Sequence, residues 1–238
     1  MKIGVLNCGP VAEELAPRYG QYDRVFADWL GARDPSLSFT GWDAHLGALP
    51  ADPDEADAWI LSGSKYGVYE DHDWIAPLSD FIRAAAVQRK PMIGVCFGHQ
   101  IMAEALGGRA EKWSGGWNLG RRVYETGSLP AWMADAPARP ALHAVHQDQV
   151  TAPPPDARTV MTGDGCAHAA LVYGDPEKPY AITIQPHPEF SDPFMKDLVE
   201  LRRGAAFPVD QSDAALAALG APTSRDWAAD WFLAFLKG

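Results

Sequence analysis

The chain has 238 residues, of which 47% are hydrophobic and 21% charged, so it can bury the core of one globular domain and is too apolar to be disordered. A formal net charge of −11 disfavours nucleic acid and anionic membranes as partners. The three cysteines (Cys8, Cys96 and Cys166) have no disulfide or metal pattern, which favours a reducing compartment. Without a signal-peptide pattern or a long apolar span, we expect a cytoplasmic protein.

The first half of the sequence alternates between short apolar runs and segments of helical periodicity. It predicts strands and helices in turn: strands over 2–7, 37–43, 58–62 and 91–95, and helices over about 21–30, 74–89 and 98–106. This alternation is typical of βαβ units on a parallel sheet. The predicted fold class is therefore α/β, with a mostly parallel, flavodoxin-like central sheet flanked by helices.

The second half is richer in strands and turns. It predicts five strands, over 117–125, 141–146, 159–162, 169–173 and 180–185. A surface loop with one short helix is expected over 205–222, and a last helix near Thr223, where Asp226 forms a capping-box-like pair with it. The apolar stripe of this helix favours docking on the body of the protein over a dimer contact. We expect a single domain over 1–238, with an extension of about 205–238 packed on it.

A nucleophile elbow is indicated around Cys96. The buried strand that ends there is followed within two residues by a helix, and Gly94 and Gly98 leave room for a sharp turn. The N-terminus of that helix favours a thiolate and offers N–H groups to an oxyanion. Taken alone, the pattern fits a buried structural cysteine equally well.

A second motif, Gln185-Pro186-His187-Pro188-Glu189, follows an apolar strand. His187 and Glu189 are two residues apart, so in extended backbone their side chains point the same way. A carboxylate beside an imidazole orients it and stabilises the imidazolium. A Cys nucleophile needs such a base, so the two motifs together favour a Cys-His-Glu triad.

These motifs resemble the class I, or triad-type, glutamine amidotransferases. The matching segments are Gly94–Gln100 and His187-Pro188-Glu189, and the turn at Gly63-Ser64 sits where that family has its oxyanion loop. The resemblance covers about residues 2–200. The segments 63–69 and 116–120 are most similar to the stand-alone, GMP-synthase-like branch, which includes γ-glutamyl peptidases.

The resemblance implies a role for each matching residue. Cys96 would attack the γ-carbonyl, His187 would transfer the proton, and Glu189 would orient His187. The oxyanion would be held by the backbone N–H groups of Phe97 and Ser64, the latter in place of a more common Gly. The implied substrate-binding residues are Gly63, Gln100 and Asp148, with Asp148 pairing with the α-ammonium.

Other polar residues are expected to be structural. His143 and His146 are three apart on a predicted strand and so point to opposite faces, which disfavours a metal pair. His99 is expected to have a helix-terminal structural role, and Cys8 to pack in the core. The sequence has no phosphate-binding glycine loop. We expect no metal and no cofactor.

The leading functional hypothesis is cysteine-dependent hydrolysis of the γ-amide of glutamine or of a γ-glutamyl compound through a thioester. Two alternatives remain open: a glutaminase subunit that delivers ammonia to a separate synthase, and a non-catalytic binding protein that keeps the fold. The small-molecule substrate is the expected partner. The leaving group and the oligomeric state stay open, a homo-oligomer included.

Overall fold

The computed structural model describes residues 1–133 and 135–238. The strands are, in chain order, β1 (Lys2–Leu6), β2 (Ser38–Trp42), β3 (Ala58–Leu61), β4 (Met92–Val95), β5 (Arg109–Lys112), β6 (Asn118–Thr126), β7 (Ala141–His146), β8 (Asp148–Ala152), β9 (Ala157–Gly163), β10 (Cys166–Tyr173) and β11 (Ala181–Ile184). The α-helices are α1 (Ala16–Tyr19), α2 (Tyr22–Gly31), α3 (Ile75–Val87), α4 (Phe97–Ala105), α5 (Asp192–Arg202), α6 (Val209–Ala217) and α7 (Arg225–Lys237).

The described residues form a nine-stranded central sheet in the order β2-β1-β3-β4-β11-β10-β9-β6-β7. The strands from β2 to β11 pair in parallel, and those from β11 to β7 pair antiparallel. The predicted α/β fold with a mostly parallel central sheet is therefore confirmed. The strand-rich second half supplies the antiparallel strands, and each predicted helix and strand is present near its predicted bounds.

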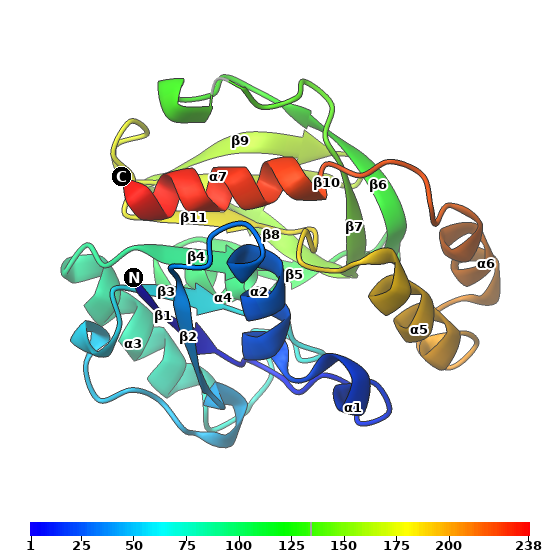
Figure 1. Cartoon of the computed structure of the whole chain (residues 1–238), viewed down its shortest axis with the longest axis horizontal. Coiled ribbons are helices and arrows are strands. Elements are labelled where there is room, and N and C mark those ends of the chain that lie inside the picture. The colour runs from blue at the N-terminus through cyan, green and yellow to red at the C-terminus, as the bar shows by residue number, and fades with distance from the viewer. Residues whose placement is uncertain (134) are drawn as a thin grey trace.

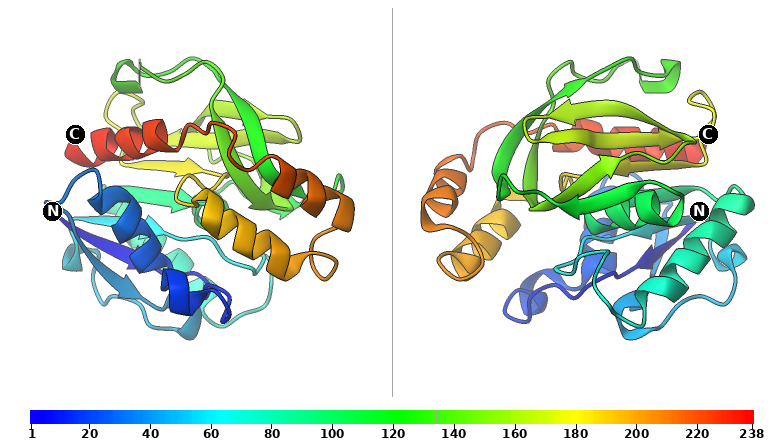
Figure 2. Two further views of the ribbon diagram at one scale, coloured as in Figure 1. Left: turned by 45° about the vertical axis from the view of Figure 1, so that its right-hand side comes forward. Right: turned by 180° about the vertical axis from the view of Figure 1, so that it is seen from behind.

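Helices cover both faces of the parallel part of the sheet. Alternate residues of a strand point to opposite faces, so Ala58 and Ile60 belong to one hydrophobic core and Trp59 and Leu61 to the other. The first core is closed by α2 and α7, which lie in front of the sheet in Figure 1. The second is closed by α3 and α4, seen from behind in the right-hand view of Figure 2.

Four of these elements lie outside the predicted set, and one of them is the single-turn helix α1. β5 and β8 form a separate antiparallel pair that packs against α4. The fourth is α5, which follows the His187 segment directly. Its start has the usual signals, since Ser191 accepts a hydrogen bond from the amide of Phe194 and Pro193 occupies the first turn. These signals were sufficient to predict a helix here.

The C-terminal segment packs along the body of the protein. The predicted short helix within 205–222 corresponds to α6. The helix α7 buries Trp231, Phe232 and five further apolar side chains. The predicted cap of the last helix is wrong, because α7 begins at Arg225 and its N-cap Ser224 makes no side-chain cap. Ser224 Oγ instead accepts a hydrogen bond from the amide of Ala141, at 3.1 Å, which ties this segment to β7. None of the helices in the described ranges has the length and apolar character needed to cross a bilayer.

Candidate active site

Three adjacent parallel strands deliver the predicted site residues to one edge of the sheet. β3 leads into Gly63-Ser64, β4 ends before Cys96, and β11 leads into His187. Because β3, β4 and β11 are neighbours and run in parallel, their carboxyl ends meet, and this is where ligands bind in α/β folds. Residues far apart in the chain are thereby brought together.

Cys96 lies on the sharp turn that the sequence predicts. Its φ of 53° and ψ of −103° are unusual for a residue with a side chain, and α4 begins at the next residue. The flanking glycines allow this turn. A Cβ at Gly94 would lie 2.6 Å from the carbonyl oxygen of Gly98, and one at Gly98 would overlap the carbonyl oxygen of Leu61. The thiol is almost fully buried, with 5% of Cys96 exposed.

His187 and Glu189 form a buried pair. His187 Nδ1 and Glu189 Oε1 are 2.7 Å apart, and neither side chain is more than 4% exposed. Burial alone lowers the pKa of His187, but the charge of Glu189 and the contact with the Cys96 sulfur outweigh it, so the pKa is raised above its ordinary value. His187 is thus bonded to Glu189 through Nδ1 and lines the same cavity as Cys96.

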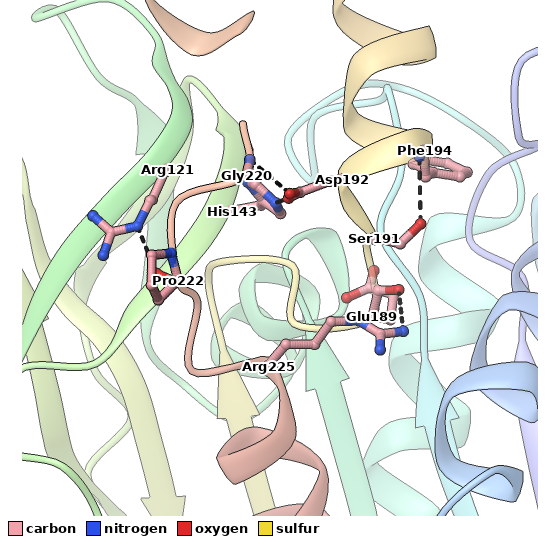
Figure 3. Close-up of polar contacts among 9 residues, drawn as sticks. All are labelled: Arg121, His143, Glu189, Ser191, Asp192, Phe194, Gly220, Pro222 and Arg225. Carbon is pink, nitrogen blue, oxygen red and sulfur yellow. Dashed lines mark hydrogen bonds and ion pairs between the residues drawn. The ribbon is translucent and has the colours of Figure 1, made fainter. Parts of the chain in front are cut away.

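Residues of the C-terminal segment contact Glu189 and Asp192, which follow His187 in the chain, as Figure 3 shows. Arg225 donates to the backbone carbonyl of Glu189 at 3.3 Å. Asp192 pairs with His143 Nε2 at 2.8 Å and also accepts from the amide of Gly220 at 2.8 Å. The sequence did not predict a role for Arg225 or Asp192 at this site, since neither lies in a recognisable motif.

Two backbone amides flank the thiol. Phe97 is the first residue of α4, so its N–H has no partner within the helix. Ser64 follows β3 and, like Phe97, donates its amide to no acceptor in the described ranges. The loop is fixed because the amide of Gly98 donates to the carbonyl of Ser62 at 3.1 Å. Ser64 is not among the described residues with positive φ, so a serine fits this backbone without strain.

Gly63 lies directly beside the imidazole. A Cβ at this position would lie 2.8 Å from His187 Cε1. Glycine is therefore required for close packing between the two loops.

A cavity of about 360 Å³ opens at this edge of the sheet and is lined by Cys96, His187, Ser64, Gln100 and Asp148, among others. The structure thus brings together most of the residues predicted from the sequence. Tyr69, which the sequence analysis did not single out, also lines the cavity.

The polar end of the cavity contains Asp148. Its Oδ2 accepts a hydrogen bond from the hydroxyl of Tyr69 at 3.0 Å, and burial raises the pKa of its carboxyl. Gln100 also lines the cavity, but its Nε2 donates to the carbonyl of Asp148 at 2.9 Å and to Gln185 Oε1 at 3.1 Å. These bonds give Gln100 a supporting position behind Asp148.

The remaining predicted polar residues have separate partners. His99 Nδ1 lies 2.7 Å from Thr183 Oγ1, and burial lowers its pKa to about 3. His146 Nδ1 donates to the carbonyl of Asp148, at 3.1 Å, while His143 pairs with Asp192. Cys8 is fully buried, and burial raises its pKa to about 12. Within the part of the chain that the structure describes, no three His, Cys, Asp or Glu side chains are grouped to hold a metal.

Comparison with known proteins agrees with this geometry. The sequence matches the family profile "Glutamine amidotransferase class-I" over residues 19–199. It is 28% identical over 200 residues to γ-glutamyl peptidase 3 of Arabidopsis thaliana, covering 79% of this chain and 77% of the relative. It is 31% identical over 206 residues to a glutamine-hydrolysing GMP synthase of Aromatoleum aromaticum, covering 79% of this chain but 34% of that protein.

The fold has close counterparts among solved structures. A glutamine amidotransferase from Thermotoga maritima superposes with a TM-score of 0.74, at 20% identity, over 100% of this chain and 96% of that one. The family resemblance seen in the Cys96 and His187 motifs is thereby confirmed, and the chain belongs to the class I glutamine amidotransferase family.

Proposed function

We propose that this protein hydrolyses the γ-amide of γ-glutamyl compounds through a covalent thioester on Cys96. The observation that carries the proposal is that the buried His187–Glu189 pair and the Cys96 elbow meet at one ligand-sized cavity, which Cys96 and His187 both line. Membership of the family supports a hydrolytic enzyme acting on such amides.

In the first step, the sulfur of Cys96 attacks the γ-carbonyl carbon while its proton passes to His187 Nε2. Glu189, bonded to His187 Nδ1 at 2.7 Å, stabilises the imidazolium that forms. His187 then gives the proton to the amide nitrogen as the C–N bond breaks, which leaves a γ-glutamyl thioester. Water, deprotonated by His187, releases glutamate and restores the thiol.

The backbone N–H groups of Phe97 and Ser64 are proposed to hold the oxyanion of both tetrahedral intermediates. Their support is position: Phe97 follows Cys96 directly, Ser64 lines the same cavity as Cys96, and neither amide donates to an acceptor in the described residues. Preorganised donors of this kind contribute about 2.7–4 kcal/mol each to the transition state.

Asp148 is proposed to bind the α-ammonium of the γ-glutamyl group, because its half-buried carboxylate lines the cavity. Gln100 is proposed to act by holding the Asp148 backbone, and Gly63 by leaving space for His187. These assignments place the amino-acid end of the substrate at the polar end of the cavity.

The main alternative is a glutaminase subunit that passes ammonia to a synthase in trans. The similarity to GMP synthases favours it, and this chain spans only about a third of that relative. The Arabidopsis γ-glutamyl peptidases, which match over most of their length, favour a stand-alone hydrolase. We also propose that 1–238 acts as one domain, with 205–238 as an extension packed on it.

Turnover by the purified protein distinguishes the stand-alone hydrolase from the glutaminase subunit. We expect release of glutamate from γ-glutamyl amides, glutathione among them, without any added protein. Absence of turnover on glutamine, glutathione and other γ-glutamyl amides alike would contradict the stand-alone hydrolase. Cys96→Ala is the control, and its far-ultraviolet circular dichroism should match that of the wild type while its turnover is abolished.

A further inference from the structure

The lining of the cavity beside Cys96 combines polar groups with a set of apolar side chains. Its volume of about 360 Å³ lies within the range of about 300–1,000 Å³ typical of small-molecule sites. One end carries the polar groups around Asp148. The other end is apolar and is lined by Val11, Leu15, Phe190, Phe194, Leu198 and Phe207.

The apolar end lies on the side of the cavity to which His187 belongs. The His187 ring stacks on Phe190, with centroids 4.1 Å apart and planes at 4°, and Phe190 stacks on Phe194 at 4.3 Å. This row of rings leads from the imidazole into the apolar end. Because the leaving nitrogen takes its proton from His187, the group attached to that nitrogen lies along this row.

A cation lines the same end of the cavity. Arg202, in the last turn of α5, is half-buried, and the described residues include no carboxylate in ion-pair contact with it. Its neighbour Arg203 is paired with Asp213, at 2.7 Å. A guanidinium recognises a carboxylate through paired N–H donors, so Arg202 fits a carboxylate on the ligand.

We propose that this end of the cavity is the subsite for the leaving group, and that it takes an α-amino acid with a large apolar side chain whose carboxylate pairs with Arg202. The substrate class is then γ-glutamyl dipeptides such as γ-glutamyl-phenylalanine. The scissile bond is the γ-amide: its carbon joins the Cys96 sulfur, and its nitrogen takes the proton from His187 and leaves as the free amino acid. This inference rests on the proposed function and narrows it.

Steady-state kinetics on four compounds tests the inference: γ-glutamyl-phenylalanine, γ-glutamyl-glycine, γ-glutamyl-benzylamide and glutamine. The benzylamide keeps the aromatic ring but lacks the carboxylate. For the wild type, we expect kcat/KM for γ-glutamyl-phenylalanine to exceed that for γ-glutamyl-glycine by about tenfold or more, because an apolar pocket discriminates by burial of the side chain.

Two variants separate the apolar from the ionic contribution. Arg202→Gln should lower the ratio of kcat/KM for γ-glutamyl-phenylalanine over γ-glutamyl-benzylamide by about tenfold. Leu198→Ser, at a partly buried position, should lower the ratio of γ-glutamyl-phenylalanine over γ-glutamyl-glycine. Arg203→Gln is the matched control, since it removes an exposed arginine one residue away, and both ratios should stay at their wild-type values.

The outcomes distinguish the inference from the proposed function. Turnover of glutamine and γ-glutamyl-glycine as efficient as that of γ-glutamyl-phenylalanine would overturn the inference and leave the proposed function intact. The same conclusion follows if Arg202→Gln and Arg203→Gln equally change the ratio of kcat/KM for γ-glutamyl-phenylalanine over γ-glutamyl-benzylamide. Lack of turnover on all four compounds, with no labelling of Cys96 by a glutamine-like electrophile, would overturn both.

Discussion

The guanidinium of Arg225 donates a hydrogen bond to the backbone carbonyl of Glu189 at 3.3 Å, so the first residue of α7 holds the acidic member of the proposed triad. Arg225 is half-buried, and its guanidinium lies over the ring of Trp29 at 5.6 Å. The position of the His187–Glu189 pair therefore depends on a helix beyond residue 199, where the match to the family profile ends.

Substitution of Arg225 should accordingly reduce the rate of the chemical step. We expect Arg225→Met to lower kcat about tenfold, equivalent to ~1.4 kcal/mol, with little change in KM, because the substrate contacts remain. Arg225→Lys keeps the charge and should recover part of the loss. Initial rates of glutamate release at a series of substrate concentrations give kcat and KM.

The control is Arg33→Met. Arg33 lies two residues after the end of α2 and pairs with Asp230 of α7, not with Glu189. Its loss should therefore leave kcat within about twofold of wild type. An equal loss of kcat in Arg33→Met and Arg225→Met would show that general loosening of α7, and not the Glu189 contact, accounts for the effect.

Gly63→Ala should damage the site without unfolding the protein. The added methyl carbon would lie 2.8 Å from His187 Cε1, so the imidazole must shift away from its position beside Cys96. We expect kcat to fall about tenfold or more, since small misplacements of reacting groups have large effects on rate. In Gly31→Ala the nearest heavy atom to the new carbon is 4.0 Å away, and its activity should match the wild type. Full activity in Gly63→Ala would contradict the proposed packing.

Asp148 should make substrate binding depend on pH. Burial raises the pKa of its carboxyl, so the carboxylate that binds the α-ammonium is protonated at a higher pH than an ordinary aspartate. The KM for glutamine should rise as the pH falls through this raised pKa, and Asp148→Asn should show a high KM that no longer changes with pH in that range. A KM equally dependent on pH in wild type and Asp148→Asn would assign the effect to another group.

Buried neutral histidines should make the fold sensitive to acid. Burial lowers the pKa of His99 and of His146 to about 3, whereas both take up a proton near pH 6.5 when unfolded. The unfolded state therefore binds more protons, and the free energy of unfolding should fall by up to ~1.4 kcal/mol per pH unit for each histidine as the pH drops from about 6.5 towards the folded pKa.

Urea unfolding at a series of pH values tests this. In His99→Gln, the free energy of unfolding should fall less steeply than in the wild type as the pH drops below about 6.5. This holds whatever the stability of the variant at neutral pH. An unchanged slope would mean that His99 is protonated in the folded protein.

The sequence predicted the strand ends and the triad because those residues belong to contiguous patterns. An apolar run followed by a glycine-flanked cysteine specifies an elbow. The extended backbone expected between His187 and Glu189 is instead a turn, in which the amide of Phe190 donates to the carbonyl of His187 at 3.3 Å, and this turn brings the two side chains together. The contacts of Tyr69 with Asp148 and of Arg225 with Glu189 join segments 79 and 36 residues apart. Only the folded chain brings them together: Arg225 lies in no motif, and the segment 63–69 that contains Tyr69 does not indicate its contact with Asp148.

Labelling with the glutamine-like electrophile diazo-oxo-norleucine is the most direct test of Cys96 as the nucleophile. Cys8 and Cys166 are buried, and burial raises the pKa of each thiol to about 12, so they should not react in the folded protein. Mass spectrometry of the native protein should show a single adduct, mapped to Cys96 and absent from Cys96→Ala. An active enzyme without an adduct at Cys96, or a folded Cys96→Ala protein with full turnover, would contradict the account.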